Sequence, residues 1–296
     1  MDLEEALRRA VAQLHDAGVP SPRADAELLA GHLLGVSRGR VAALALAGAP
    51  APDGFADLVA RRSTRIPLQH LTGVAYFRHL ELAVGPGVFI PRPETELLAQ
   101  LAIDRARAVL AERGSVRVVD LGTGSGAVAA SVASEVPGSE VHAVELSEAA
   151  YPYAERNTVP HGVRLHAGDL RTAFAGEDSR FDIVVSNPPY IPPGAIPRDP
   201  EVREHDPDLA LYGGGPDGLD LPRAVIATAE RLLLPGGFLA LEHADVQGPA
   251  MLGLFAASGR WRDVAGHRDL NDADRATSGY LARDLDPLDD MEEWTP

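Results

Sequence analysis

Residues 116–126 read Val116-Arg117-Val118-Val119-Asp120-Leu121-Gly122-Thr123-Gly124-Ser125-Gly126, an apolar run that passes directly into a glycine-rich turn. A segment rich in alanine and valine, with the pattern of a helix, follows. Glycine lets the backbone turn sharply and approach a ligand without a Cβ clash, and the start of the helix offers unpaired amide donors. This order of strand, turn and helix predicts an α/β sheet with a ligand site at the turn.

A carboxylate on the next predicted strand indicates what this turn binds. A glycine cluster alone is most often only a turn, but Glu145 ends the following apolar run, where an acid can accept both hydroxyls of a ribose. The spacing Gly-x-Gly-x-Gly after Asp120 differs from the Gly-x-Gly-x-x-Gly that seats a pyrophosphate. The turn therefore favours S-adenosylmethionine over a dinucleotide.

A third acidic position extends the same site. Asp169 and Leu170 lie just beyond the third predicted strand, where the carboxylate can bond the exocyclic amine of adenine and the leucine can pack on the ring. Taken alone, Asp169 would be an ordinary loop or cap residue. The predicted cofactor-binding residues are Gly122, Thr123, Gly124, Ser125, Gly126, Glu145, Asp169, Leu170 and Asn187.

Outward from this turn, strands and helices alternate to the end of the chain, which predicts a doubly wound, Rossmann-like sheet. The expected strands are 116–120, 140–145, 163–167, 181–186 and 237–242, followed by a pair near 262–269 and 278–284.

The fourth of these strands ends in Asn187-Pro188-Pro189-Tyr190, on the side of an open α/β sheet where ligands bind. Two prolines make the turn rigid and remove amide donors, so the Asn187 side-chain oxygen and the Pro188 carbonyl are two acceptors for one NH₂ group. Tyr190 can stack on a flat substrate. We predict Asn187, Pro188 and Tyr190 as catalytic residues, with Pro189 also in the substrate site.

These acceptors suit a planar nitrogen that is a poor nucleophile, such as a glutamine side-chain amide. Two acceptors favour electron density on the nitrogen, and positioning supplies much of the remaining rate. The motif alone leaves a glutamine in a release factor, a glutamine in a ribosomal protein and an adenine flipped out of DNA all open as acceptors. A noncatalytic module on the same fold is a further alternative.

The remainder of the chain divides by pattern. Residues 1–72 predict a small all-helical bundle, opened by Asp2 as N-cap with Glu5 three residues on. Residues 73–92 predict a β-hairpin linker with short runs at 74–77, 80–84 and 88–90. A methyltransferase domain over 93–285, with its first helix running to about Arg113, and an acidic, solvated tail over 286–296 complete the expected organisation.

Composition limits the partners. The 27 basic and 43 acidic residues give a formal net charge of -16, which argues against tight, nonspecific nucleic-acid binding. The chain has no cysteine, and no His, Asp or Glu cluster has metal-ligand spacing, so we expect no metal. Without a membrane-spanning run or a basic leader, we expect a cytoplasmic protein with no membrane partner. We also expect the protein to be monomeric.

At several motifs the sequence resembles the release factor glutamine methyltransferase family, which modifies the glutamine of the Gly-Gly-Gln motif in peptide chain release factors. The resemblance covers nearly the whole chain. Beyond the glycine turn and the Asn-Pro-Pro-Tyr loop, it rests on Pro67-Leu68-Gln69-His70, Ile90-Pro91-Arg92-Pro93-Glu94-Thr95-Glu96, Asp217-Gly218-Leu219 and Leu241-Glu242-His243.

The resemblance implies a helical first domain that helps to dock the release factor and a seven-stranded class I methyltransferase sheet with an antiparallel last strand. It also implies that the Asn187 loop holds the substrate amide. Leu170 stands where the family often has a large aromatic residue, so adenine packing should be weaker or come from elsewhere. Glu145 stands where aspartate also occurs, and both reach ribose hydroxyls.

Overall fold

The computed structural model describes residues 1–282, which form two compact units. One unit comprises Met1–Ala75, Val84–Ile90 and Ile196–Asp206, and the other comprises Tyr76–Ala83, Pro91–Ala195 and residues 207–282. The acidic tail predicted over 286–296 lies outside the described residues.

The first unit is helical. Asp2 is the N-cap of its first helix, as predicted, because the Asp2 carboxylate accepts a hydrogen bond of 2.8 Å from the Glu5 amide. The Glu5 side chain does not complete a capping box, since it pairs with Arg8 and Arg9 instead. Buried side chains such as Leu7 form one core between the helices. The helices are α1 (Leu3–Asp16), α2 (Pro22–Leu34), α3 (Arg38–Leu46), α4 (Phe55–Ser63), α5 (Leu68–Thr72) and α9 (Pro200–His205).

A buried ion-pair network joins α9 to the bundle within this unit. The Arg62 guanidinium of α4 lies 2.8 Å from both the Asp25 carboxylate and the Glu201 carboxylate, and Arg65 also pairs with Glu201. Burial alone would raise the pKa of Glu201, but hydrogen bonds to its charged form, led by that of Arg65, lower it to about 2. The segment after the Asn-Pro-Pro-Tyr loop is therefore anchored to α4 and α2 through paired charges.

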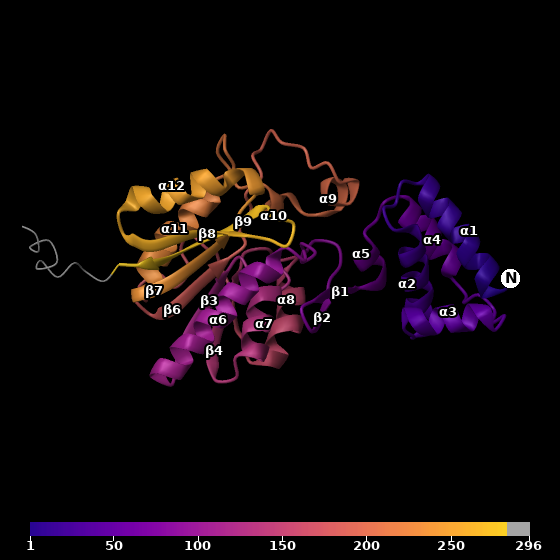
Figure 1. The fold of residues 1–296 in the computed structure, drawn as a ribbon, viewed down its shortest axis with the longest axis horizontal. Coiled ribbons are helices and arrows are strands. Elements are labelled where there is room, and N and C mark those ends of the chain that lie inside the picture. The colour runs from indigo at the N-terminus through magenta and orange to yellow at the C-terminus, as the bar shows by residue number, and fades with distance from the viewer. Residues whose placement is uncertain (283–296) are drawn as a thin grey trace, which may run out of the picture. The chain divides into compact units, whose positions relative to one another are not determined.

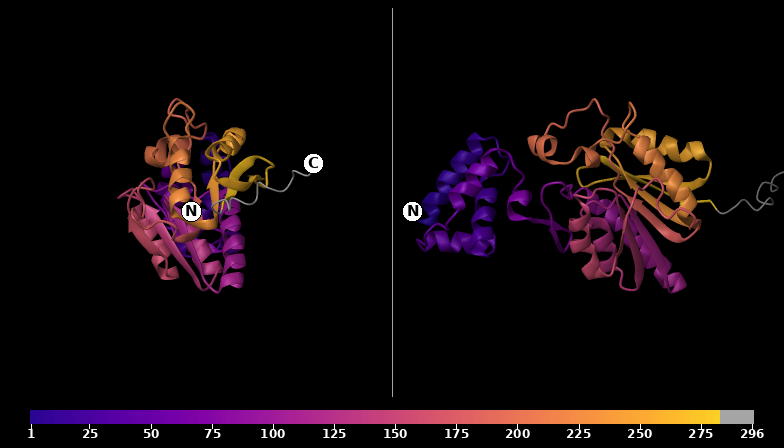
Figure 2. Two further views of the ribbon diagram at one scale, coloured as in Figure 1. Left: turned by 90° about the vertical axis from the view of Figure 1, so that its left-hand side faces the viewer. Right: turned by 180° about the vertical axis from the view of Figure 1, so that it is seen from behind.

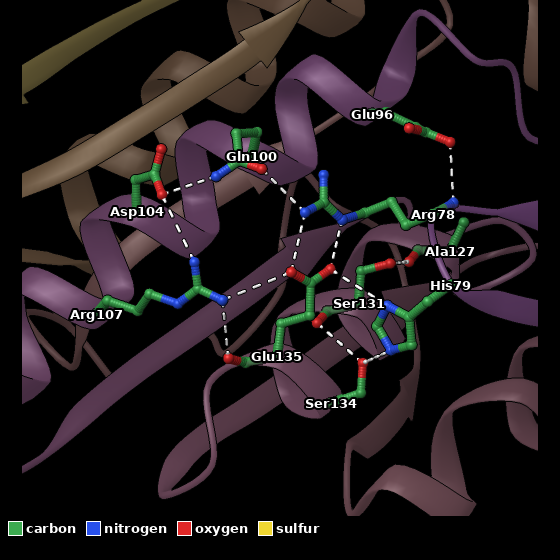
Figure 3. A network of polar contacts seen from close by, with 10 residues as sticks. All are labelled: Arg78, His79, Glu96, Gln100, Asp104, Arg107, Ala127, Ser131, Ser134 and Glu135. Atoms are coloured by element: carbon green, nitrogen blue, oxygen red, sulfur yellow. Dashed lines mark hydrogen bonds and ion pairs between the residues drawn. The ribbon is translucent and has the colours of Figure 1, made fainter.

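The predicted hairpin is present as a two-stranded sheet of β1 (Val74–Phe77) and β2 (Leu80–Ala83). Its turn lies within the second unit, where Arg78 donates 2.9 Å hydrogen bonds to Gln100 and Glu135, and the Arg78 backbone amide donates to Glu96 (Figure 3). The third expected run, 88–90, is not a strand. The strand expectation there rested on apolar residues alone.

The second unit contains a seven-stranded sheet in the order β5-β4-β3-β6-β7-β9-β8. The strands β3 to β7 pair in parallel, whereas β9 is antiparallel to both β7 and β8. The predicted doubly wound sheet with an antiparallel last strand is thus confirmed. The strands are β3 (Val116–Leu121), β4 (Ser139–Glu145), β5 (Arg164–Ala167), β6 (Phe181–Ser186), β7 (Leu233–Glu242), β8 (Trp261–Arg268) and β9 (Asp274–Leu281).

Helices cover both faces of this sheet, and Figures 1 and 2 show α6 and α7 on the side opposite α11 and α12. Side chains alternate along β3 accordingly: Val116 and Val118 belong to the core beneath α6 and α7, and Val119 and Leu121 to the core beneath α11 and α12. The helices are α6 (Thr95–Arg113), α7 (Ala127–Glu135), α8 (Tyr151–Thr158), α10 (Asp208–Leu211), α11 (Asp220–Leu232) and α12 (Gly248–Ser258), with short 3-10 turns η1 (Val159–His161) and η2 (Asp245–Gln247).

Candidate active site

The loops that follow β3, β4, β5 and β6 leave the sheet at one edge, because these strands are parallel and neighbouring. The predicted cofactor residues and the Asn187 loop all lie on these loops or at the strand ends. The structure therefore brings the predicted site residues to a single edge of the second unit, where open α/β sheets bind ligands.

The glycine turn after β3 packs closely on the neighbouring helix α8. Gly126 has a φ of +84°, and a Cβ atom at this position would overlap the Thr158 side chain. Only glycine satisfies both conditions at once. By contrast, a Cβ atom built on Gly124 would meet nothing within 4 Å, so the middle of the turn faces open space.

Asp120 holds the turn from inside. The buried Asp120 carboxylate accepts a hydrogen bond of 2.6 Å from the Thr123 hydroxyl and one of 3.3 Å from the Ala129 amide. Burial raises the pKa of Asp120 to about 7, against the opposing effect of these two donors. Asp120 thus ties the end of β3 to the turn and to the first turn of α7.

Glu145 connects the turn after β3 to the loop after β4. One carboxylate oxygen accepts a 2.7 Å hydrogen bond from the Gly124 amide, and the other accepts one of 2.7 Å from the Ser147 amide. Burial raises the pKa of Glu145, and the backbone donors of Ser147 and Gly124 oppose this. A carboxylate oxygen can accept more than one hydrogen bond, so Glu145 retains acceptor capacity beside the turn.

The loop after β5 carries an ion pair that the sequence did not predict. The Asp169 carboxylate pairs with the guanidinium of Arg171, which holds the pKa of Asp169 below its usual range. Leu170 is buried, and its Cδ2 atom lies 3.6 Å from where a Cβ atom would stand on Gly122. Leu170 is therefore an apolar wall next to the glycine turn, and Asp169 is already in an ion pair.

Asn187, at the end of β6, is held by a residue of α6. The Asn187 Nδ2 atom donates a hydrogen bond of 3.3 Å to the Thr95 hydroxyl, which in turn donates one of 3.2 Å to the Glu242 carboxylate. Thr95 and Glu242 are buried, with 4% and 2% of their surfaces exposed. Both residues stand in motifs quoted above, but the sequence assigned no role to either.

The rest of the Asn-Pro-Pro-Tyr loop is braced by backbone contacts. The Ile191 amide donates to the Leu211 carbonyl at 2.8 Å, and the Gly213 amide donates back to the Ile191 carbonyl at 3.0 Å. The buried Gln247 amide group then donates to the carbonyls of Tyr190 and Asp217, at 2.9 and 3.0 Å. These bonds fix the path of the chain just beyond Asn187.

Two glycines permit this bracing because their backbones touch the loop. A Cβ atom on Gly213 would stand 2.6 Å from the Pro189 carbonyl oxygen, and one on Gly218 would stand 2.7 Å from the Pro192 nitrogen. Any larger residue would displace the loop. Gly218 of the Asp217-Gly218-Leu219 motif thus lies in close contact with the backbone that follows Pro189.

Charged groups surround the Tyr190 phenol. Burial raises the pKa of Tyr190, the Glu242 charge raises it further, and the Arg275 guanidinium partly offsets both. Burial likewise raises the pKa of Glu242, to about 7. Arg275 is the second residue of β9 and also pairs with Asp269 at 3.1 Å.

Asn157 of α8 is a further site residue that sequence reasoning missed. Its Nδ2 atom donates to the carbonyls of Ser125, in the glycine turn, and Ala83, at the end of β2, at 2.8 and 2.9 Å. Its Oδ1 atom accepts from the Ala83 amide at 2.8 Å. No local pattern marks Asn157, because its partners are distant in the sequence.

No group of His, Cys, Asp and Glu within residues 1–282 could hold a metal ion. In the same part of the chain, no helix combines the length and apolar character needed to cross a membrane.

The comparisons with known proteins agree with this fold. Residues 5–73 match the family model of the PrmC N-terminal domain, and residues 95–197 match the methyltransferase small domain. A methyltransferase from Pyrococcus furiosus superposes with a TM-score of 0.50 over 69% of this chain and 89% of its own, and at 19% identity it shares the fold alone. Fold and site together define a methyltransferase with a Rossmann-like sheet.

The curated relatives identify the family. The chain is 52% identical to the release factor glutamine methyltransferase of Streptomyces coelicolor, over 93% of this chain and 97% of the relative. It is 46% identical to that of Mycolicibacterium smegmatis, over 95% and 99%. The chain therefore belongs to the release factor glutamine methyltransferase family, as the sequence motifs indicated.

One relative has another substrate in its name. A 4-amino-L-phenylalanine/4-methylamino-L-phenylalanine methyltransferase from Streptomyces pristinaespiralis is 44% identical over 91% of this chain and 92% of its own length. Proteins this similar to the chain thus differ in the acceptor they are named for.

Proposed function

We propose that this protein methylates the side-chain amide nitrogen of the glutamine in the Gly-Gly-Gln motif of peptide chain release factors, with S-adenosylmethionine as methyl donor. The observation that carries the proposal is the Asn187-Pro188-Pro189-Tyr190 loop, fixed at the edge of the sheet that also bears the glycine turn. Full-length similarity to enzymes named for this substrate supports the choice of acceptor.

The residues at the glycine turn fit the proposed cofactor. The turn is open at Gly124, Glu145 keeps acceptor capacity for ribose hydroxyls, and Leu170 offers an apolar wall for adenine. Asp169 would reach the adenine amine only by sharing its carboxylate with Arg171. When bound, S-adenosylmethionine supplies an activated methyl group on a sulfonium.

The Asn187 loop would hold the acceptor amide. The lone pair of an amide nitrogen is delocalised into its carbonyl, so an enzyme must position this nitrogen and favour electron density on it. The Asn187 Oδ1 atom and the Pro188 carbonyl can accept the two N–H groups, and the Tyr190 ring can line a flat amide. Rigid placement of the acceptor accounts for much of the expected rate enhancement.

The relative from Streptomyces pristinaespiralis favours one alternative acceptor, an aromatic amine, because it shares 44% identity with this chain. An aromatic amine is also a planar NH₂ group whose lone pair is delocalised. The same two acceptors could therefore hold it, and the choice between the two substrates is a matter for experiment.

Mass mapping distinguishes these acceptors. The purified full chain is incubated with S-adenosylmethionine and, in parallel, with a release factor, with 4-amino-L-phenylalanine, with ribosomal proteins and with duplex DNA. We expect one methyl group on the glutamine of the Gly-Gly-Gln peptide, and none on a release factor in which this glutamine is replaced by asparagine. Methylation of another acceptor without any on the release factor would overturn the proposal.

The proposed substrate also implies a cellular location and a protein partner for the enzyme. Release factors act during translation, so we propose that the protein acts in the cytoplasm with a release factor as its protein partner. The formal net charge of -16 disfavours a nucleic-acid partner. The monomeric state stays a prediction.

A further inference from the structure

Behind Asn187 lies a short chain of hydrogen bonds that ends on a buried carboxylate. Asn187 Nδ2 donates to Thr95 Oγ1, and Thr95 Oγ1 donates to Glu242 Oε1. The second oxygen, Glu242 Oε2, is buried and has no hydrogen-bond partner among the described residues. A buried carboxylate with one unsatisfied oxygen is unfavourable for folding, so this arrangement calls for a functional explanation.

The number of protons available to the hydrogen bonds between Asn187, Thr95 and Glu242 decides which way the Asn187 amide faces. A threonine hydroxyl has one proton, and Thr95 commits it to the Glu242 carboxylate, so Thr95 Oγ1 can only accept from Asn187. Asn187 must then present its NH₂ group to Thr95. The Asn187 Oδ1 atom is left as the acceptor for an outside donor, although the oxygen and nitrogen ends of an amide are nearly identical in shape.

We propose that Glu242, acting through Thr95, is the positioning residue that fixes the orientation of the Asn187 carboxamide and so makes the site select an NH₂ group as methyl acceptor. This inference rests on the proposed function, since it concerns the acceptor side of the same site. Glu242 and Thr95 need not touch the substrate.

Protonation of Glu242 would remove this control. A protonated carboxyl can donate to Thr95, whose hydroxyl is then free to donate to Asn187 Oδ1 after the amide turns over. The Asn187 NH₂ group would then face the NH₂ group of the substrate, so that two donors oppose each other. The active arrangement therefore needs the Glu242 carboxylate.

Charged and titratable groups on the neighbouring elements set the pH at which Glu242 becomes protonated. Burial raises the pKa of Glu242 to about 7, and Glu94, just before α6, raises it as well. Thr95, the Arg275 charge on β9 and the Asn187 side chain lower it. Tyr190 of the catalytic loop stays protonated, since burial raises its pKa. The acceptor orientation should accordingly be fixed above neutral pH and lost progressively below it.

Nuclear magnetic resonance of the free enzyme tests this without any substrate. The chain has only three asparagines, Asn157, Asn187 and Asn271, so labelling with ¹⁵N-asparagine gives three side-chain NH₂ groups. We expect the Asn187 signals to shift with a midpoint near pH 7 in the wild type and not in Glu242→Gln. The exposed Asn271 is the internal control. An Asn187 signal that does not titrate, or titrates equally in Glu242→Gln, would overturn the proposal.

Kinetics and stability give a second, independent test. Above neutral pH we expect Glu242→Gln and Thr95→Val to lose at least about tenfold in kcat. The KM for S-adenosylmethionine should stay the same, and Thr95→Ser should lose far less because it keeps the hydroxyl. Thr228→Val removes a buried hydroxyl elsewhere in the second unit and is the matched control.

Thermal unfolding separates positioning from a structural role. Glu242→Gln should unfold at the same or a higher temperature than the wild type, because a neutral group replaces a buried charge. A variant that unfolds earlier in proportion to its lost activity, or one that keeps full kcat, would refute the positioning role. If the wild type fails to methylate the release factor, the proposed function fails, and the Asn187 titration still decides this inference.

Discussion

Replacement of Asn157 by alanine should weaken both the fold and the cofactor site. The change removes three hydrogen bonds of 2.8–2.9 Å, to the Ser125 carbonyl, the Ala83 carbonyl and the Ala83 amide. A hydrogen bond of this kind contributes about 1 kcal/mol net, and unsatisfied buried groups cost more than exposed ones. We expect a loss of about 2–3 kcal/mol in the free energy of unfolding, because water can reach the half-buried Ala83 but not the Ser125 carbonyl.

Loss of the hydrogen bond to the Ser125 carbonyl should also weaken cofactor binding. With the glycine turn less firmly held, we expect S-adenosylmethionine to bind about tenfold more weakly, equivalent to about 1.4 kcal/mol. Urea unfolding measures the first effect and titration calorimetry the second. Asn157→Asp is the matched control, since it keeps the acceptor for the Ala83 amide and loses both donors. Unfolding within about 0.5 kcal/mol of the wild type together with unchanged cofactor affinity would refute the reasoning.

Three further changes test other parts of the structure. Asn187→Ala should leave cofactor binding largely intact and reduce turnover at least about tenfold, and undiminished turnover would refute the role of Asn187. Gly218→Ala adds a methyl group that overlaps the Tyr190 carbonyl, so kcat should fall at least about tenfold while the glycine turn still binds cofactor; normal kcat would contradict the bracing. Arg62→Met leaves Glu201 buried without its full set of partners and should destabilise the first unit by about 3–5 kcal/mol in urea unfolding. Since the folded-state pKa of Glu201 is lowered from 4.5 to about 2, its contribution to stability should be present above pH 4.5 and lost as the pH falls toward 2; a flat profile there would contradict the ion pair.

Much of the sheet could be predicted because the strands are buried on both faces. The strands β3, β4 and β6 are buried along most of their length, and their bounds were predicted to within a residue. The last strand was predicted to begin at 278, whereas β9 begins at Asp274. Its first residues are mostly polar, and pairing with β7 and β8 makes them a strand. The opposite error at 88–90 has the same cause, since apolar residues without a partner strand do not form one.

The residues of the candidate site likewise fall into two groups, those that the local sequence predicts and those that it does not. The glycine turn, Glu145 and Asn187 follow directly from strand ends, so local sequence was enough to predict their place. The contacts of Gln247 and Asn157 depend on residues far away in the chain and leave no local pattern. Long-range packing, which the fold alone decides, supplies the groups that hold the predicted loops in place.

Mass mapping of the product identifies the acceptor of the methyl group. The wild-type chain is incubated with S-adenosylmethionine and a full-length release factor, and the product peptides are mapped by mass and fragmentation. We predict a single methyl group on the side-chain nitrogen of the Gly-Gly-Gln glutamine. A release factor left unmodified by enzyme that binds the cofactor, or a methyl group on any other residue, would contradict it.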